Sequence, residues 1–371
     1  MKIINILLSI LFLHVTVQAV ELYQPAMPAR CFAMGGTCIA HTRGAQALFV
    51  NAAALARVEG FDFIVGQVQG GVSKDAERFI TQAQGNSSNL TLADVSQLYG
   101  KTLTADISAR SGLVMPYFGV GAYSQNYLVE TFSNPTFPTF NANFISDYGY
   151  AIAGAIPVGP TTSFGVTGRH VKRWGGNKDI NVTDLVGNND RDLINQTFQD
   201  HGVGNALDLS FITTFPSSLK PTLAMVWQDV GSTRFEMSSG TQAPPSQKDN
   251  LIFGASIEHE IPHVTFTHAL EYKFITTENE TFSKKIHLGT EASFGLIDLR
   301  AGVSQGYLTY GAGVDLWLIK ADVAFYSTEL GTYAGQTKSD RYQASVTINF
   351  DFDQSFKLNL DGKKRRLKQR R

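Results

Sequence analysis

The residue types best suited to chemistry lie together in the run His259-Glu260-Ile261-Pro262-His263. Its spacing is H-E-x-x-H, a zinc-binding pattern in which a helix brings both histidines to one face. Pro262 stands inside that spacing, and proline breaks a helix because it has no amide hydrogen to donate. The residues on either side alternate between apolar and polar types, which is typical of β-strands. We therefore predict a turn between two strands here, and no metal site.

Residues 1–19 have the three parts of a secretory signal. Lys2 supplies the positive charge, residues 3–17 the apolar core, and Val17-Gln18-Ala19 a small-residue cleavage site. We predict that the mature chain starts at Val20 and is exported.

Cys31 and Cys38 are the only cysteines of this chain. In an oxidising compartment they could form a disulfide that closes a small loop around Gly35 and Gly36, or they could remain as two thiols. The sequence leaves both alternatives open. A lipid anchor on Cys31 is not expected, because Arg30 precedes it and the apolar core of the signal ends well before it.

No other group of residues predicts chemistry. We find no nucleophile–base pair, phosphate loop or nucleotide fingerprint. The chain is therefore predicted not to be an enzyme, to use no cofactor and to bind no nucleic acid.

The run from residue 341 to residue 351 alternates strictly. An apolar face from Tyr342 to Phe350 has an aromatic residue at each end, and the other face is polar. About ten residues is the length that a tilted strand needs to cross the hydrocarbon layer, and aromatic rings gather at the two membrane interfaces. We interpret this run as the closing strand of a barrel. Its end at Phe350 resembles the strand that the outer-membrane assembly machinery recognises.

Alternation and turn residues predict thirteen more strands. Connections after even-numbered strands are short and most of those after odd-numbered strands are long, as expected for periplasmic turns and outer loops. The fold class is therefore all-β: a transmembrane antiparallel barrel of about fourteen strands over residues 61–352, in a bacterial outer membrane, with both termini periplasmic. The predicted strands are 61–69, 105–116, 118–131, 144–156, 161–174, 203–214, 220–230, 250–260, 263–275, 284–294, 296–304, 306–317, 318–328 and 341–352.

The two faces of the later strands differ. The outward set is apolar and the inward set carries both signs of charge, which predicts a braced or plugged interior rather than an ion-selective pore. His268 falls on the outward face, where we favour a slip in register over a contact with a neighbouring subunit. The outward set is Val264, Phe266, Leu270, Tyr272, Phe274, Leu308, Tyr310, Ala312, Val314 and Leu316; the inward set is Glu258, Glu271, Lys273, Lys285, Glu291, Asp298, Arg300, Asp315, Lys320 and Asp322.

The two long connections at 70–104 and 175–202 each hold a stretch with helical spacing, at 92–99 and 190–200. We expect these stretches to cover the barrel rim or to form an outer lip that captures lipid.

The charge is unevenly distributed. Seven of the 31 basic residues follow Gly362, so without these and Lys2 the chain has 31 − 7 − 1 = 23 basic residues against 32 acidic ones. The basic run at the end of residues 353–371 predicts a disordered tail, because its like charges repel and bury nothing. The tail is either a solvated extension or a contact for an acidic partner or anionic headgroups.

Residues 20–60 do not alternate and carry a motif. Met34-Gly35-Gly36-Thr37 is followed by Ala45 to Ala56 with Asn51 inside. This pattern resembles the N-terminal signature of the FadL-like outer-membrane proteins, a group that also includes PorV-like and TraF-like barrels. Those chains read MGG(T/A)G(V/I)A and then, about a dozen residues later, NPA(A/L)L. Here Cys38 replaces the glycine and Ala52 the proline.

The resemblance implies that residues 20–60 form a hatch inside the barrel, with Met34, Gly35, Gly36 and Asn51 as hatch residues. It also implies passive uptake of long-chain fatty acids or other hydrophobic compounds. The alternative is a non-transport barrel that serves as a scaffold or accessory in secretion or conjugation. An apolar lumen with a gap in the wall would favour transport, and a charge-filled lumen would favour the scaffold. The partners expected are outer-membrane lipids, the assembly machinery and a hydrophobic ligand; no residue can be assigned to that ligand.

Overall fold

The computed structural model describes residue 21 and residues 27–85, 99–133, 139–181, 197–278 and 280–352. The predicted signal peptide, the tail at 353–371 and most of the two stretches with helical spacing, 92–99 and 190–200, lie outside the described residues.

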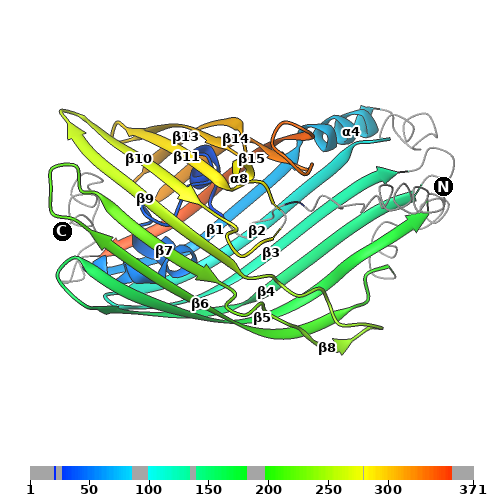
Figure 1. Ribbon diagram of the computed structural model, residues 1–371, viewed down its shortest axis with the longest axis horizontal. Helices are drawn as coiled ribbons and strands as arrows, with labels where there is room; N and C mark the ends of the chain where they lie inside the picture. The colour runs from blue at the N-terminus through cyan, green and yellow to red at the C-terminus, as the bar shows by residue number, and fades with distance from the viewer. Residues whose placement is uncertain are drawn as a thin grey trace, which may run out of the picture.

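Fourteen antiparallel strands close into a barrel (Figure 1). The ring closes because β1 pairs with β15 and β5 with β6. The predicted number and the antiparallel arrangement are confirmed. The strands are β1 (Phe61–Ser73), β2 (Thr102–Met115), β3 (Phe118–Ser133), β4 (Thr139–Pro157), β5 (Thr162–Asn181), β6 (His201–Thr214), β7 (Thr222–Gln228), β9 (Asn250–Ile261), β10 (Val264–Tyr272), β11 (Ile286–Ser293), β12 (Ile297–Ser304), β13 (Tyr307–Leu316), β14 (Ile319–Glu329) and β15 (Lys338–Phe352); a short β8 (Glu236–Ser239) pairs with β6 outside the ring.

The alternation of β15 is the one that the sequence predicts. Val346 and Ile348 are 51% and 42% exposed on the outer face, whereas Thr347 and Asn349 between them are buried toward the lumen. A strand places successive side chains on opposite faces, so one side of the wall meets lipid and the other meets the interior.

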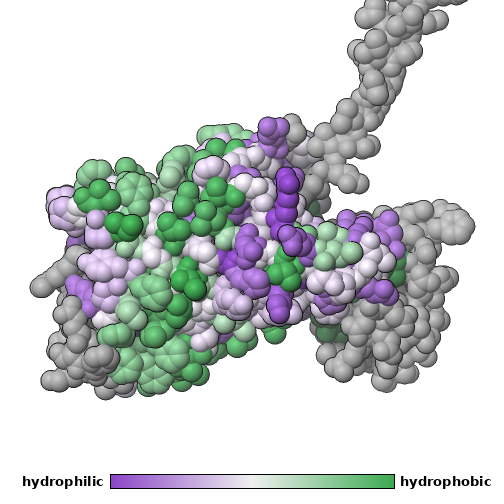
Figure 2. Space-filling view, turned by 90° about the horizontal axis from the view of Figure 1, so that it is seen from below, coloured by the Kyte–Doolittle hydropathy of each residue, from purple (hydrophilic) through white to green (hydrophobic). Residues whose placement is uncertain are grey.

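Exposed apolar side chains from the strands of the ring form a belt around the barrel. Figure 2 shows this belt on one face of the molecule, next to a more polar zone. Aromatic rings mark two levels of this belt. Tyr310, Phe325 and Tyr342 form a contiguous outer row, with ring centroids 5.1 Å and 5.3 Å apart. Tyr342 and Phe350 are eight residues apart, about 26 Å along a strand, and at a tilt of about 40° this stretch spans about 20 Å of an apolar band about 25 Å tall.

The two ends of the barrel differ. Short turns join β2 to β3, β4 to β5, β6 to β7, β9 to β10, β11 to β12 and β13 to β14 at what we call the short-turn end, on the left in Figure 1. At the long-loop end the helix α4 (Lys74–Gly85) covers the rim, where Ala76 packs against Leu103 and Phe132. Strands β4 and β5 run 19 and 20 residues and are longer than predicted at this end.

Two predictions about the outward face are wrong. Phe274 is 6% exposed, because β10 ends at Tyr272 and the chain turns inward with a positive φ of 55° at Phe274. His268 does not mark a slip, because β10 keeps regular register with both neighbours. Its ring nitrogen Nδ1 lies 2.8 Å from Oγ1 of Thr290, and its ring stacks on that of His259.

Short helices occupy the interior. They are α2 (Ala29–Ala33), η1 (Gly44–Gln46), α3 (Ala47–Val50) and η2 (Ala52–Arg57). A further short helix, α8 (Phe282–Lys285), lies in the connection from β10 to β11, and its Phe282 is exposed. Within the described ranges, no helix is both long enough and apolar enough to span a membrane.

Candidate functional site

The N-terminal segment, residues 27–58, fills the lumen; it is dark blue in Figure 1. Ala29 at its start donates its amide to the side chain of Gln69 on β1 (2.9 Å). Near its end, the carbonyl of Leu55 accepts from the amide of Tyr117 at the short-turn rim (3.2 Å). The segment therefore runs from the middle of the lumen to the short-turn end, and most of its side chains are buried.

The sulfur atoms of Cys31 and Cys38 are bonded to each other, and the disulfide closes a loop that contains Met34, Gly35 and Gly36. Gly35 and Gly36 have φ values of 67° and 86°. Glycine adopts this left-handed conformation at little cost because it has no β-carbon. The two glycines of the motif thus make the tight turn at the tip of the loop.

The loop fits into a notch in the wall made by three inward-facing glycines: Gly289 on β11, Gly302 on β12 and Gly311 on β13. A β-carbon on Gly289 would lie 2.8 Å from the carbonyl carbon of Met34, and one on Gly311 would lie 2.6 Å from the β-carbon of Ala33. Such distances are too short for real side chains. The wall therefore needs glycine here to let the backbone of the segment approach.

Hydrogen bonds hold the loop in this notch. The amide of Gly35 donates to Oγ1 of Thr309 (2.9 Å), and the carbonyl of Gly35 accepts from the ring of His287 (2.9 Å). Oε1 of Glu271 accepts from the amides of Cys38 and Ile39, the latter at 2.6 Å.

Lys273, which directly follows β10, also binds the loop. Its ammonium donates to the carbonyl of Gly36 and lies 3.3 Å from Oε2 of Glu271. Both side chains of the pair are 0% exposed. A buried carboxylate and a buried ammonium are tolerated here because each meets the other and the backbone of the loop.

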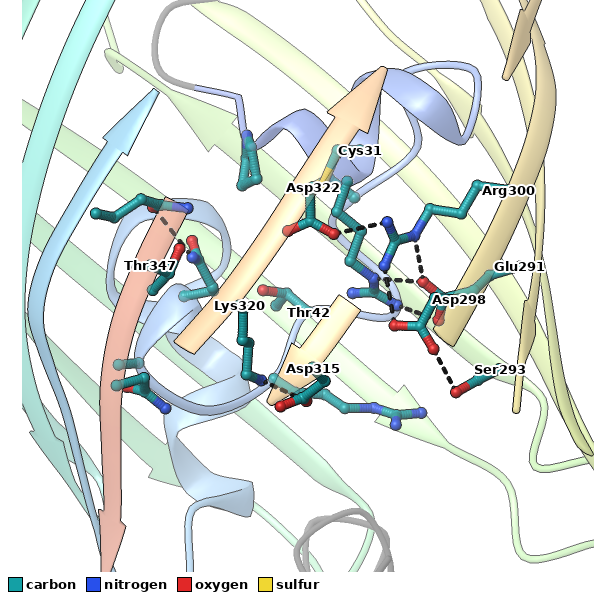
Figure 3. A pocket seen from close by; sticks show the side chains of 18 of the residues that line it. Cys31, Thr42, Glu291, Ser293, Asp298, Arg300, Asp315, Lys320, Asp322 and Thr347 are labelled. Atoms are coloured by element: carbon teal, nitrogen blue, oxygen red, sulfur yellow. Dashed lines mark hydrogen bonds and ion pairs between the residues drawn. A yellow bond between two sulfur atoms is a disulfide. The ribbon is translucent and has the colours of Figure 1, made fainter. Parts of the chain in front are cut away.

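An ion network braces the same side of the lumen (Figure 3). Glu291 contacts Arg30 of the segment (2.8 Å) and Arg300 of β12 (2.7 Å). Arg300 also contacts Asp298 (3.0 Å) and Asp322 (2.7 Å). Burial alone would lower the pKa of Arg30, but the three carboxylates raise it above its ordinary value. A cavity of about 150 Å³ lies beside this network.

The opposite side of the segment packs through apolar contacts. Ile39, Leu48 and Leu55 lie in one buried cluster with Val114 of β2 and Ile212 of β6. The lumen is therefore divided: ion pairs fix the segment toward β10–β14, and apolar side chains fix it toward β2–β7.

Asn51 connects two parts of the segment. Its side chain accepts from the amide of Ala53 (3.1 Å) and donates to the carbonyl of Ile39 (2.9 Å). Asparagine favours such positions because its short amide side chain caps a helix start. Ala52 is the first residue of η2, a position that also accepts proline, so the departure from the motif leaves the local geometry intact.

A larger cavity, which we call the inner cavity, lies at the short-turn end and has a volume of about 640 Å³. His41 lines it and is 5% exposed. Burial, together with the charge of Arg30, lowers the pKa of His41 to about 3. A smaller outer cavity, about 60 Å³, lies on the other side of the segment against Met27 and Phe32.

The connection at residues 229–249 folds into the long-loop mouth, which alternation could not predict. Arg173 of β5 donates to both carboxylate oxygens of Asp147 (2.7 Å each) and to the carbonyl of Pro245 (2.7 Å). Asp200 accepts from the amides of Thr241 (2.8 Å) and Gln242. These contacts hold the connection over β4–β6.

The H-E-x-x-H run has no helical geometry. His259 lies in β9, and His263 lies in the turn before β10 with a φ of 69°. Its two histidines therefore do not share a helix face, and the predicted turn is confirmed.

The sequence matches no protein-family model and no curated protein. Solved structures do match. The TodX deltaS2S3 mutant monoaromatic hydrocarbon channel is 13% identical over 88% of this chain and 99% of its own, with a TM-score of 0.54. A TodX deltaS2 mutant channel is 12% identical over 87% and 97%, with a TM-score of 0.51. The Pseudomonas putida toluene transporter TodX is 12% identical over 90% and 99%, with a TM-score of 0.48.

At these identities the likeness establishes the fold. The chain has the FadL-like barrel fold of these hydrocarbon channels, and the predicted transmembrane β-barrel is confirmed.

Proposed function

We propose that this chain is an outer-membrane barrel for the passive uptake of hydrophobic compounds, either long-chain fatty acids or other apolar molecules. The N-terminal segment acts as its hatch, with Met34, Gly35, Gly36 and Asn51 fixing the hatch conformation. The short-turn end of the barrel, where β15 ends at Phe352, faces the periplasm, and the outer-membrane assembly machinery recognises the strand that ends near Phe350. Glu21 instead pairs with Arg341 near the long-loop start of β15 (2.6 Å), so the predicted periplasmic position of the N-terminal end is not retained. The protein is not an enzyme, so a compound crosses it unchanged.

One observation carries this proposal: the segment that fills the lumen has a cavity on each side. The outer cavity touches Met27 and Phe32, and the inner cavity touches residues from Ala40 to Arg57. The same segment lines both cavities, so a shift of this segment would open a path between them.

The contacts that hold the N-terminal segment in the lumen are compatible with such a shift. On one side of the segment these contacts are hydrogen bonds and ion pairs to Glu271, Lys273 and Glu291. Water can replace partners of this kind one by one, whereas interlocked large side chains would have to move together. The apolar side is built mainly from alanines such as Ala47, Ala53 and Ala54.

Uptake by whole cells tests the proposal. A bacterial host without a channel of this kind would express the full chain, and the accumulation of a radiolabelled long-chain fatty acid and of a labelled monoaromatic hydrocarbon would be followed. We expect initial rates at least five-fold above those of cells with the empty vector. If cells that express the chain take up neither compound faster than cells with the empty vector, the proposal is overturned.

A second candidate function is a scaffold in secretion or conjugation. The observation in its favour is the charge-braced side of the lumen, where Arg30, Glu291, Arg300, Asp298 and Asp322 form one buried network. A scaffold would leave both uptake rates unchanged and would retain a secretion component through affinity purification from native membranes. A channel predicts faster uptake and no dependence on such a component.

A further inference from the structure

The inner cavity has the size and position of a ligand site at the periplasmic exit. Its volume of about 640 Å³ falls within the range of about 300–1,000 Å³ found for small-molecule pockets. Tyr117, Pro160 and Phe215 contribute to its walls from three different short turns. Because these turns form the rim, the cavity lies where a compound would leave the barrel.

Three cations line this cavity, and two of them have acidic partners. Arg43 pairs with Glu258 of β9, and Lys220 lies 3.3 Å from Glu260. Arg57 differs: among the described residues no carboxylate contacts it, and its guanidinium donates to Oγ1 of Thr214 (2.6 Å). Burial lowers the pKa of Arg57 to about 10, so the side chain stays charged at neutral pH.

The position of Arg57 is fixed by the helix that carries it. Arg57 is the last residue of η2, and Asn51 caps the other end of that helix. Oγ of Ser163 donates to the carbonyl of Ala53 (2.7 Å), which ties η2 to β5. The charge is therefore held at the cavity wall rather than free to turn into bulk water.

Hydroxyl groups stand beside the guanidinium. Oγ1 of Thr214 lies 2.8 Å from Oγ1 of Thr222, and both residues line the cavity. Ala54, Ala56 and Phe215 supply apolar wall nearby. A single uncompensated cation with hydroxyl donors and apolar surroundings suits a compound with one anionic head and an apolar body.

We propose that the inner cavity binds the carboxylate of an amphiphilic organic acid, with Arg57 and Thr214 as its head-group ligands. A guanidinium presents two parallel N–H donors, which match the two oxygens of a carboxylate. This inference rests on the proposed function, because the inference specifies which class of transported compounds binds at the short-turn end before leaving the barrel. The apolar body of the acid would lie along Ala54, Ala56 and Phe215.

Equilibrium dialysis of the full-length barrel in a neutral detergent, with a detergent-only blank, tests the site. The probes are labelled octanoate, labelled octan-1-ol and inorganic phosphate as a competitor. We expect octanoate to bind at least ten-fold more tightly than octanol, and phosphate at millimolar concentration to compete weakly. Equal affinities for the acid and the alcohol would overturn the proposal, and so would displacement of octanoate by phosphate at equal concentration.

Variants locate the contact. Arg57→Met should weaken octanoate binding at least ten-fold and leave octanol binding unchanged, and Arg57→Lys should retain part of the affinity. The matched control Lys338→Met removes one positive charge at the long-loop end, where Lys338 is half-exposed, and should change neither. If Arg57→Met does not fold, as judged by loss of the compact band of unboiled protein on a denaturing gel, Thr214→Val tests the same site. Unchanged octanoate binding in a folded variant at Arg57 or Thr214 would contradict the assignment.

Uptake of a neutral hydrocarbon separates this inference from the proposed function, since such a compound has no head group. If the native chain speeds hydrocarbon uptake but does not prefer octanoate, the anion site alone is wrong. If uptake of the hydrocarbon and uptake of the long-chain fatty acid are both unchanged, the proposed function is wrong.

Discussion

A β-carbon on Gly289 would lie 2.8 Å from the carbonyl carbon of Met34. Segment and wall are therefore in direct backbone contact across a site that tolerates no side chain on the wall. Gly302 lies opposite Gly289 in the sheet and Gly311 faces the same loop from β13. Because the wall carries glycines at these positions, the backbone of the eight-residue disulfide loop can lie directly against it.

Gly289→Ala should displace the loop. The added methyl group meets Met34 and Thr37 of the segment, and such overpacking costs about 1–3 kcal/mol. We expect a lower urea midpoint and faster proteolysis of the segment in the folded barrel. Gly168→Ala is the matched control, because a β-carbon there meets no atom within 4 Å. If both variants behave like the native protein, the notch does not hold the loop.

Lys273→Met should strongly lower the free energy of unfolding, because Lys273 holds the N-terminal segment against the wall. It leaves the carboxylate of Glu271 buried without its counter-ion, and breaking a buried pair costs roughly 3–5 kcal/mol. The double variant Glu271→Gln/Lys273→Met should recover part of this loss, since no charge is then left unpaired. Urea unfolding of the four proteins of this cycle measures the coupling, and additive effects would contradict a direct interaction.

Cys31→Ser/Cys38→Ser should loosen the segment and leave the barrel intact. Opening a loop of eight residues costs roughly 2–3 kcal/mol through the unfolded state. We expect protease sites within residues 27–58 to become accessible, while the heat-modifiable band of the barrel persists. Equal protection of the segment with and without the disulfide would refute this.

Acid should lower the stability of the folded protein, because His41 of the N-terminal segment is buried in its neutral form. The pKa of His41 is about 3 in the folded protein, against 6.5 for an ordinary histidine, because of burial and Arg30. The unfolded chain therefore binds a proton between these values that the folded chain does not, and stability falls as the pH drops below 6.5. Between pH 7 and pH 4.5 the expected loss is about 2–3 kcal/mol.

His41→Leu removes this group and serves as the reference, because other titrating groups contribute equally to both proteins. The native protein should lose more stability than His41→Leu over this interval in urea titrations. Identical losses would show that His41 is not buried in its neutral form.

Much of the barrel is predictable from sequence because a strand with one lipid face and one interior face must alternate. Each predicted strand overlaps a strand of the ring, and the alternation of β15 matches residue by residue. Strand ends are less certain, since polar residues beyond the membrane carry no alternation signal. This explains why β4 and β5 extend past their predicted ends, and why Phe274 faces inward just after β10.

The interior depends on contacts between distant parts of the chain, and sequence patterns do not contain these. The glycines at 289, 302 and 311 have no local signature that distinguishes them from outward-facing Gly168. The charged inward residues were predicted, but not that Arg30 of the segment would join Glu291 and Arg300. Arg57 could not be singled out, because its lack of an acidic partner is a property of the folded cavity.

Tethering the segment to the wall tests the central claim, that uptake requires the segment to move, most directly. Arg30→Cys/Glu291→Cys places two thiols where the two side chains now meet beside the 150 Å³ cavity, with the native disulfide retained. A bifunctional thiol reagent would join them, and a monofunctional reagent of the same chemistry gives the matched control. Uptake of a labelled hydrophobic compound by whole cells is then compared. The account predicts uptake at least ten-fold slower in tethered than in singly labelled protein; equal uptake in both would contradict it.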